Sequence, residues 1–219
     1  MLARGIAVLL IAASFASAQT SKSKATAAVP MRTLPPPKDE SGRDKTLTAF
    51  FLRLKDVLKR KDRDALLAML AEDVEPGIGN QRGPSAFSTV WGLGDPNNGV
   101  YGLIAQIRSM PGVWVQDQFC GPYVGIQFPP DLDPSKYQVI LNPDVKLRET
   151  PSPSGKVLGT LAYNIVEVLE RDTWMKVRTE SGLTGYVDAG YVYSPAAYRM
   201  CVAKNAAGMW RISSLKAGR

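Results

Sequence analysis

Apolar side chains recur at helical spacing through the first half of the chain. The clearest stripe occupies positions i, i+3, i+4, i+7, i+10 and i+11, and it consists of Leu47, Phe50, Phe51, Leu54, Val57 and Leu58. Such a stripe predicts an amphipathic helix whose apolar side faces a core. Asp44 or Thr46 is a suitable N-cap, and the basic run Lys59, Arg60 and Lys61 suits the negative end of the helix dipole.

Three more helices are predicted before residue 110. The first is capped by Asp62 or Asp64, runs through residues 65–70 and ends near Asp73. After a glycine-rich break at residues 77–83, shorter helices are expected around 85–93 and 98–110. We interpret the apolar positions of these helices as core. Residues 44–138 are therefore predicted to form a mainly helical domain.

The hydrophobic period changes from helical to strand-like after residue 139. Short runs of alternating residues are separated by turn-forming clusters, for example at 150–155 and 180–183. The predicted strands are 145–148, 157–161, 166–170, 174–178, 184–187 and 191–193. Short strands with turns at this spacing indicate a small β-barrel over residues 139–194.

The barrel segment resembles the bacterial SH3 family. Its residues match the opening of the family pattern at Leu147, Arg148, Pro151, Ser154, Val157, Leu158, Gly159 and Leu161, the middle at Trp174, Lys176 and Val177, and the end at Gly182, Gly185, Tyr186, Val187 and Tyr191. Leu147 stands where valine is commoner, and Tyr186 where tryptophan is commoner. The resemblance implies a binding module, often for cell-wall peptidoglycan or a peptide, without catalytic residues of its own.

Five barrel residues are candidate ligand-binding residues. Trp174, Tyr186, Tyr191 and Tyr193 offer aromatic faces on which a sugar or an extended peptide can stack. Arg148 is suited to pair with a carboxylate of a wall peptide. The alternative is that Trp174 and Tyr186 fill the small core and that Arg148 lies at a solvated strand edge.

The first residues have the layout of a secretory signal. Arg4 is followed by a mostly apolar run over residues 6–15, and Ala16-Ser17-Ala18 fits a small-residue cleavage pattern. We expect residues 1–18 to be a signal peptide, which makes the protein exported, either periplasmic or extracellular, and leaves no membrane span after cleavage. Residues 19–43 are rich in Ser, Lys, Thr, Ala and Pro and are predicted to be a disordered linker.

The two cysteines flank the barrel. In an exported protein, Cys120 and Cys201 are expected to form a disulfide, and the alternative is two buried free thiols. Residues 195–219 are expected to form a hairpin that packs back on the helical domain. The predicted fold class is therefore α+β, with an N-terminal helical domain completed by the hairpin and an SH3-like β-barrel inserted between them.

The closing segment carries a second, looser resemblance. Residues 203–204 and 208–212 resemble the closing strand pair of exported bacterial proteins that combine a helical region with an SH3 insert. This resemblance supports the architecture and implies no activity.

Charge and composition narrow the function classes. The formal net charge is +7, but residues 19–43 contribute five basic and two acidic residues, so much of the excess lies outside the folded part. No run of Lys and Arg interleaved with aromatic residues marks a nucleic-acid surface. The chain has no histidine, which removes His-based catalysis and His metal ligands, and two cysteines cannot build a thiolate zinc site. No metal or cofactor is predicted.

Three function classes follow. The leading hypothesis is a non-enzymatic envelope protein whose barrel recognises peptidoglycan or a protein or peptide ligand. An enzyme is the alternative, with a carboxylate site at Glu72, Asp73 or Glu75, although solvation of a helix end explains these residues better. The third class is a structural or regulatory subunit of an envelope complex.

Overall fold

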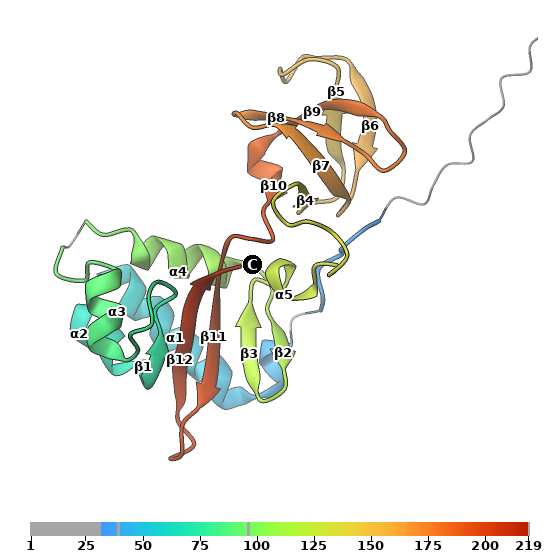
Figure 1. Cartoon of the computed structure of the whole chain (residues 1–219). Coiled ribbons are helices and arrows are strands. Elements are labelled where there is room, and N and C mark those ends of the chain that lie inside the picture. Colours follow the sequence, from blue (N-terminus) through green and yellow to red (C-terminus); the bar gives the residue numbers. More distant parts are fainter. Residues whose placement is uncertain (1–31, 39, 96, 219) are drawn as a thin grey trace, which may run out of the picture.

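The computed structural model describes residues 32–38, 40–95 and 97–218, and it has two parts (Figure 1). One part combines helices with a five-stranded sheet, and the other is a small seven-stranded β structure. The fold is therefore α+β. The predicted signal peptide and the first part of the predicted linker lie outside the described residues. No helix among the described residues is long and apolar enough to cross a membrane.

The five-stranded sheet is built from both ends of the chain. Its strand order is β1-β12-β11-β3-β2, with β1 parallel to β12 and the other pairs antiparallel. The bounds are β1 Leu70–Glu75, β2 Val113–Val115, β3 Gln118–Gly121, β11 Tyr198–Lys204 and β12 Trp210–Ala217. The predicted terminal hairpin is thus β11 and β12, and it forms the centre of the sheet.

Helices pack against this sheet through the main hydrophobic core. They are α1 Lys45–Arg60, α2 Arg63–Ala68, α3 Pro84–Val90 and α4 Val100–Ser109. The short η1 Ser41–Arg43 has no buried residue, and the buried Val124 of α5 Val124–Gln127 belongs to a different cluster. The predicted stripe of α1 lies in that core, where Phe50 and Leu54 contact the same cluster as Val202 and Ile212 of the sheet. The helix ends at Arg60, and the next residue, Lys61, has a left-handed backbone with a φ of 52°.

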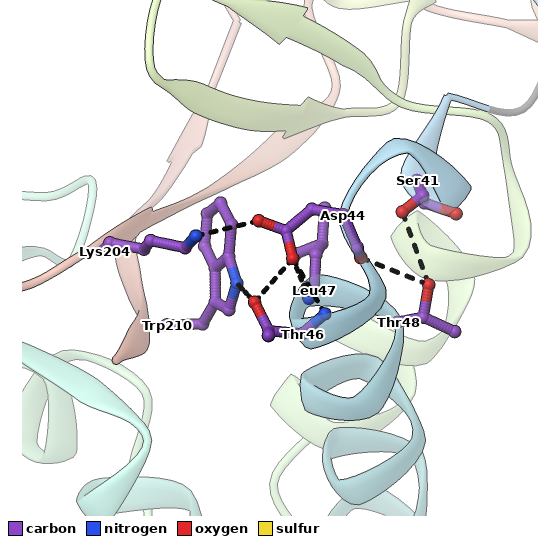
Figure 2. A network of polar contacts seen from close by, with 7 residues as sticks. All are labelled: Ser41, Asp44, Thr46, Leu47, Thr48, Lys204 and Trp210. Carbon is purple, nitrogen blue, oxygen red and sulfur yellow. Dashed lines mark hydrogen bonds and ion pairs between the residues drawn. The ribbon is translucent and has the colours of Figure 1, made fainter. Parts of the chain in front are cut away.

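The start of α1 is tied to the hairpin by a polar network (Figure 2). Asp44 is the N-cap, and its carboxylate accepts hydrogen bonds from the backbone N–H groups of Thr46 and Leu47. The same carboxylate is 2.8 Å from Nζ of Lys204, and Nε1 of Trp210 donates to Oγ1 of Thr46 at 2.9 Å. Asp44 therefore joins the first helix to β11, and Thr46 joins it to β12.

The region from residue 44 to 138 is less helical than predicted. The second helix ends at Ala68, and residues 70–75 form strand β1 instead of the expected continuation to Asp73. The spacing of the buried residues Leu70 and Val74 fits one face of a helix and also one face of a strand. In the structure this segment is a strand because it pairs with β12. The strands β2 and β3 were also missed, because each is only a few residues long.

The second part is a barrel-like sheet with the order β10-β4-β7-β8-β9-β5-β6. The bounds are β4 Tyr137–Ile140, β5 Val145–Arg148, β6 Val157–Leu161, β7 Ile165–Glu170, β8 Trp174–Arg178, β9 Thr184–Asp188 and β10 Val192–Tyr193, with η2 at Ala189–Tyr191. The predicted strands are confirmed, and β4 is one more. The core of the barrel is aliphatic and consists of Ile140, Val145, Leu147, Leu161, Val166, Val177 and Val187.

The chain enters and leaves the barrel at one place. Strands β4 and β10 are antiparallel neighbours, with Tyr193 opposite Val139. The predicted disulfide is present between Cys120 and Cys201, which are register partners on β3 and β11. The strands just before and just after the barrel are therefore joined both covalently and by the sheet.

A third apolar cluster lies where the two parts meet. Tyr123 and Val124 follow β3, whereas Val139, Ile165 and Tyr193 belong to the barrel strands. Leu34 packs against the same cluster, its N–H donates to the carbonyl of Tyr163, and the Tyr123 hydroxyl donates to the Leu34 carbonyl at 3.0 Å.

The N-terminal segment differs from the predicted disordered linker. Thr33 forms a β-bridge with Asn164, and Arg32 contacts both Asp131 and Glu180. Further along, Glu40 accepts a hydrogen bond from the indole of Trp114. Composition alone did not reveal these contacts, because they depend on backbone groups and on two or three side chains. The described residues of this segment therefore contact both parts of the molecule.

Candidate ligand-binding pocket on the barrel

An open pocket of about 450 Å³ lies at one end of the barrel. Its wall is formed by the loop before β5, by β5 itself, by the start of β8 and by the end of β9 with η2. The lining residues are Asn142, Pro143, Asp144, Val145, Lys146, Arg148, Pro153, Trp174, Asp188 and Tyr191. Three of the five candidate residues, Arg148, Trp174 and Tyr191, therefore lie together.

The two aromatic residues of the pocket are accessible. Trp174 is half-buried and Tyr191 is 44% exposed. Because the core of the barrel is aliphatic, Trp174 is not needed to fill it. Trp174 sits at the first position of β8, opposite Asp188 on β9, so the sheet fixes its backbone while the ring faces the pocket. The arrangement provides apolar faces for stacking.

Arg148 is held in place by the loop between β5 and β6. Its guanidinium donates to the carbonyl of Gly155 at 2.8 Å, and the side chain is half-buried. A Cβ at Gly155 would lie 2.5 Å from Oγ1 of Thr150, so glycine allows this tight loop. Arginine carries five N–H donors, and a single hydrogen bond leaves donors for an acceptor in the pocket. Arg148 can thus bind a carboxylate without first being released.

Charges of both signs surround the pocket. Lys146 and Arg148 are basic, and Asp144 and Asp188 are acidic. Asp188 also accepts a hydrogen bond from the N–H of Gly190 and so caps η2. A ligand that carries both an amino group and a carboxylate fits this distribution better than one with a single charge.

The remaining two candidates lie elsewhere. Tyr193 belongs to the cluster between the two parts, its hydroxyl donates to the Tyr198 carbonyl at 3.4 Å, and burial raises its pKa to about 12. Tyr186 lies on β9 opposite Arg148 and Lys176, and Nζ of Lys176 is 5.9 Å from the centre of its ring. Neither tyrosine lines the pocket, so the structure separates them from the other three.

The sequence interpretation missed the loop residues of the pocket. Asn142, Pro143, Asp144 and Pro153 are in turns, and Asp188 ends a strand, so none of them stands out by periodicity. Asp144 has a left-handed backbone with a φ of 61°, a conformation that Asn and Asp adopt more readily than most residues. The Asn-Pro-Asp sequence before β5 was the available signal for a turn at this place.

Residues 143–193 match the family described as bacterial SH3 domain. The chain contains a bacterial SH3 domain. The match covers β5 to β10, and hence nearly all of the pocket, and this kind of domain is a cell-wall or peptide binding module. The bacterial SH3 domain is therefore consistent with a binding role for the chain.

Other comparisons add little to the bacterial SH3 domain. No curated protein matches the chain. A solved chain titled Rd1NTF2_05, with five substitutions in its title, is 12% identical with a TM-score of 0.28, and the alignment covers 80% of this chain and 100% of that one. Similarity at that level carries no argument about fold or function.

The carboxylates of the alternative site lie far from the SH3 domain in sequence, and all three are on β1. Asp73 and Glu75 line an open polar pocket of about 500 Å³, and Glu72 is exposed without lining it. Hydrogen bonding from Lys216, at 2.6 Å, holds the pKa of Glu75 below its usual value, and Arg82 adds to the effect. A general acid requires a raised pKa, which Glu75 lacks. Among the described residues, no cluster of three or more His, Cys, Asp or Glu side chains is placed to hold a metal ion.

Proposed function

We propose that this is a non-enzymatic, exported binding protein whose bacterial SH3 domain recognises cell-wall peptidoglycan or an envelope peptide through the pocket at Arg148, Trp174 and Tyr191. The observation that carries the proposal is the meeting of these three residues in one open pocket. Two aromatic faces and one fixed guanidinium are suited to an extended ligand that has a carboxylate.

The charges of the pocket favour a peptide stem over a bare sugar. Sugars need aromatic faces and neutral hydrogen-bonding groups, whereas this pocket adds two basic and two acidic side chains. A short wall peptide carries both free carboxylates and free amino groups. We therefore propose that Arg148 binds a carboxylate, that Asp144 or Asp188 binds an ammonium group, and that Trp174 and Tyr191 contact the apolar stem.

Export is part of the proposal. The disulfide between Cys120 and Cys201 supports it, because disulfides persist in oxidising compartments and are rare in the cytosol. The signal layout of residues 1–18 supports it independently. Expression in a bacterium with its own leader, followed by mass spectrometry of the mature chain, tests both, with Gln19 expected at the N-terminus. An intact leader on a cytoplasmic chain with two free thiols would contradict export.

We also propose that the SH3 domain is an insert whose orientation is fixed. The sheet pairs β11 with β3 across the barrel segment, and Tyr123, Val139 and Tyr193 share one apolar cluster. Relative motion of the two parts would expose that cluster to water, so the pocket is held at one angle to the rest of the molecule. The binding module is therefore expected to move as one body with the α/β part.

Sedimentation of the full chain with insoluble peptidoglycan tests the binding proposal. We expect retention of the wild type and about tenfold weaker binding for Trp174→Leu and for Tyr191→Leu, because each removes an aromatic face. Tyr186→Leu is the matched control, since Tyr186 lies on the same domain outside the pocket. Thermal unfolding establishes that each variant is folded. Absence of retention for the folded wild type would overturn wall binding.

A further inference from the structure

A second hollow lies on the helical layer, remote from the SH3 pocket. It is an open groove of about 730 Å³ between α1 and α4, with a largely apolar surface. Leu52 of α1 is 65% exposed beside it, although the other apolar residues of that helix mostly face the core. An exposed leucine at the edge of an apolar groove is typical of an interaction surface.

The rim of the groove carries one sign of charge. Lys55, Lys59 and Lys61 line it from α1 and its end, and Arg108 lines it from α4. Among the described residues that line the groove, none is acidic. Arg108 lies flat on the apolar wall, with its guanidinium 3.5 Å from the centre of the Phe51 ring. The groove therefore combines an apolar floor with a basic rim.

The floor of the groove leaves room for another chain. Gly102 and Ala105 are two small α4 residues that line the groove, and a Cβ added at Gly102 would meet no described atom within 4 Å. Glycine inside a helix costs roughly 0.5–1 kcal/mol relative to alanine, and among the described residues none lies close enough to exclude a Cβ at Gly102. Along α1, Leu52, Lys55 and Lys59 follow the spacing i, i+3, i+7 and form one continuous edge.

We infer that the α1–α4 groove is a docking site for an acidic amphipathic helix of a partner protein. Its apolar side chains would enter between Leu52 and Ala105, and its carboxylates would face Lys55 and Lys59. A second copy of the chain is disfavoured, because the chain has a formal net charge of +7 and would bring like charges to a basic rim. A recessed groove also suits an inserted helix better than a flat membrane surface.

Fluorescence anisotropy with a designed probe tests the inference on the full mature chain. The probe is a labelled helical peptide of about 15 residues with Leu at i, i+3, i+4 and i+7 and Glu at its polar positions. A second peptide has Lys in place of every Glu. We expect saturable binding of the acidic peptide, weaker binding at higher salt, and no saturable binding of the basic peptide.

Variants locate the binding surface. Leu52→Gln and Lys55→Glu are each expected to weaken binding of the acidic peptide about tenfold. Leu169→Gln and Lys156→Glu are the matched controls, because they make the same changes at exposed positions of the SH3 domain, and they are expected to leave binding unchanged. All four positions are exposed, so the variants should unfold at nearly the wild-type temperature.

Three results would overturn the inference. The first is absence of saturable binding of the acidic peptide to the folded wild type. The second is a lack of specificity, seen either as equal binding of both peptides or as control variants that weaken binding of the acidic peptide as much as the groove variants do. The third is capture of the protein by vesicles containing anionic phospholipid, lost in Leu52→Gln, without binding of the acidic peptide, because it would assign the groove to a membrane surface. None of these outcomes depends on the SH3 pocket, so a failure here leaves the proposed function unaffected.

Discussion

At the scale of single residues, Asp44 has several roles in the α/β part. It caps α1, accepts a hydrogen bond from the hydroxyl group of Thr46 and forms an ion pair with Lys204, whose Nζ also lies 5.1 Å from the ring centre of Trp210 (Figure 2). Hydrogen bonds from Lys204 and then Thr46 hold the pKa of Asp44 far below its usual value. The charged form is thus favoured by folding, and the stability of the protein becomes linked to this carboxylate.

We predict that Asp44→Asn lowers the melting temperature at pH 7. Because the folded pKa is depressed, the contribution of the charge is present above the unfolded pKa, near 3.8, and is lost as the pH falls further toward the folded pKa. The difference between wild type and variant should therefore narrow below pH 4. Asp56→Asn is the control, since Asp56 forms an exposed pair with Arg60 on the same helix. A difference that stays constant down to pH 2 would contradict this account.

At the scale of elements, the sequence predicted strands of the barrel better than those of the five-stranded sheet. Each barrel strand alternates over several residues and is followed by a turn signal, so pattern alone locates it. Strand β1 was predicted as helix because Leu70 and Val74 fit both periods, and its partner β12 lies about 140 residues further along the chain. Of the binding candidates, the family pattern located Arg148, Trp174 and Tyr191 but did not separate them from Tyr186 and Tyr193.

The turn after β1 gives a prediction at this scale. Gly77 and Gly79 both have positive φ angles, 86° and 72°. A Cβ at Gly77 would lie 2.5 Å from the carbonyl oxygen of Leu215, whereas one at Gly79 would meet nothing within 4 Å. Gly79→Ala is expected to cost roughly 1 kcal/mol for its backbone alone, and Gly77→Ala at least twice as much. Urea unfolding of both variants measures the difference, and equal losses would show that β12 does not confine this turn.

At the scale of the whole molecule, the junction joins the SH3 domain to the α/β part. Tyr123 is only 1% exposed, and Tyr193 is half-buried. Burial raises the pKa of each tyrosine to about 12. Their neutral forms are therefore favoured by folding. This contribution is complete below the unfolded pKa near 10 and is lost as the pH rises through the folded values.

We predict a delayed alkaline titration at this junction. Tyr123 and Tyr193 should stay protonated at pH about 11 in the folded protein, because their pKa values are about 12, and should ionise at lower pH in the unfolded chain. Ultraviolet absorbance of tyrosinate, with and without denaturant, measures this. Tyr123→Phe and Tyr193→Phe should each remove one delayed tyrosine. Ionisation of all eight near pH 10 in the folded protein would show that the junction is open to water.

The disulfide is expected to stabilise the same assembly. Cys120 and Cys201 are 81 residues apart in sequence, and closing a loop of that length stabilises a fold by about 4–5 kcal/mol through the entropy of the unfolded chain. The double variant Cys120→Ala and Cys201→Ala should therefore lose about this amount in urea unfolding. A loss below about 1 kcal/mol would show that the sheet pairing of β3 with β11 suffices without the bond.

The central claim is that the SH3 domain binds its ligand at the pocket of Arg148, Trp174 and Tyr191. The most direct measurement is an amide and indole chemical-shift titration of the full mature chain with a soluble peptidoglycan fragment that retains its peptide stem. We expect saturable shifts at the indole N–H of Trp174 and at the amides of residues 142–148 and 188–191, and their loss in Trp174→Leu. Absence of shifts, or shifts confined to residues outside this pocket, would contradict it.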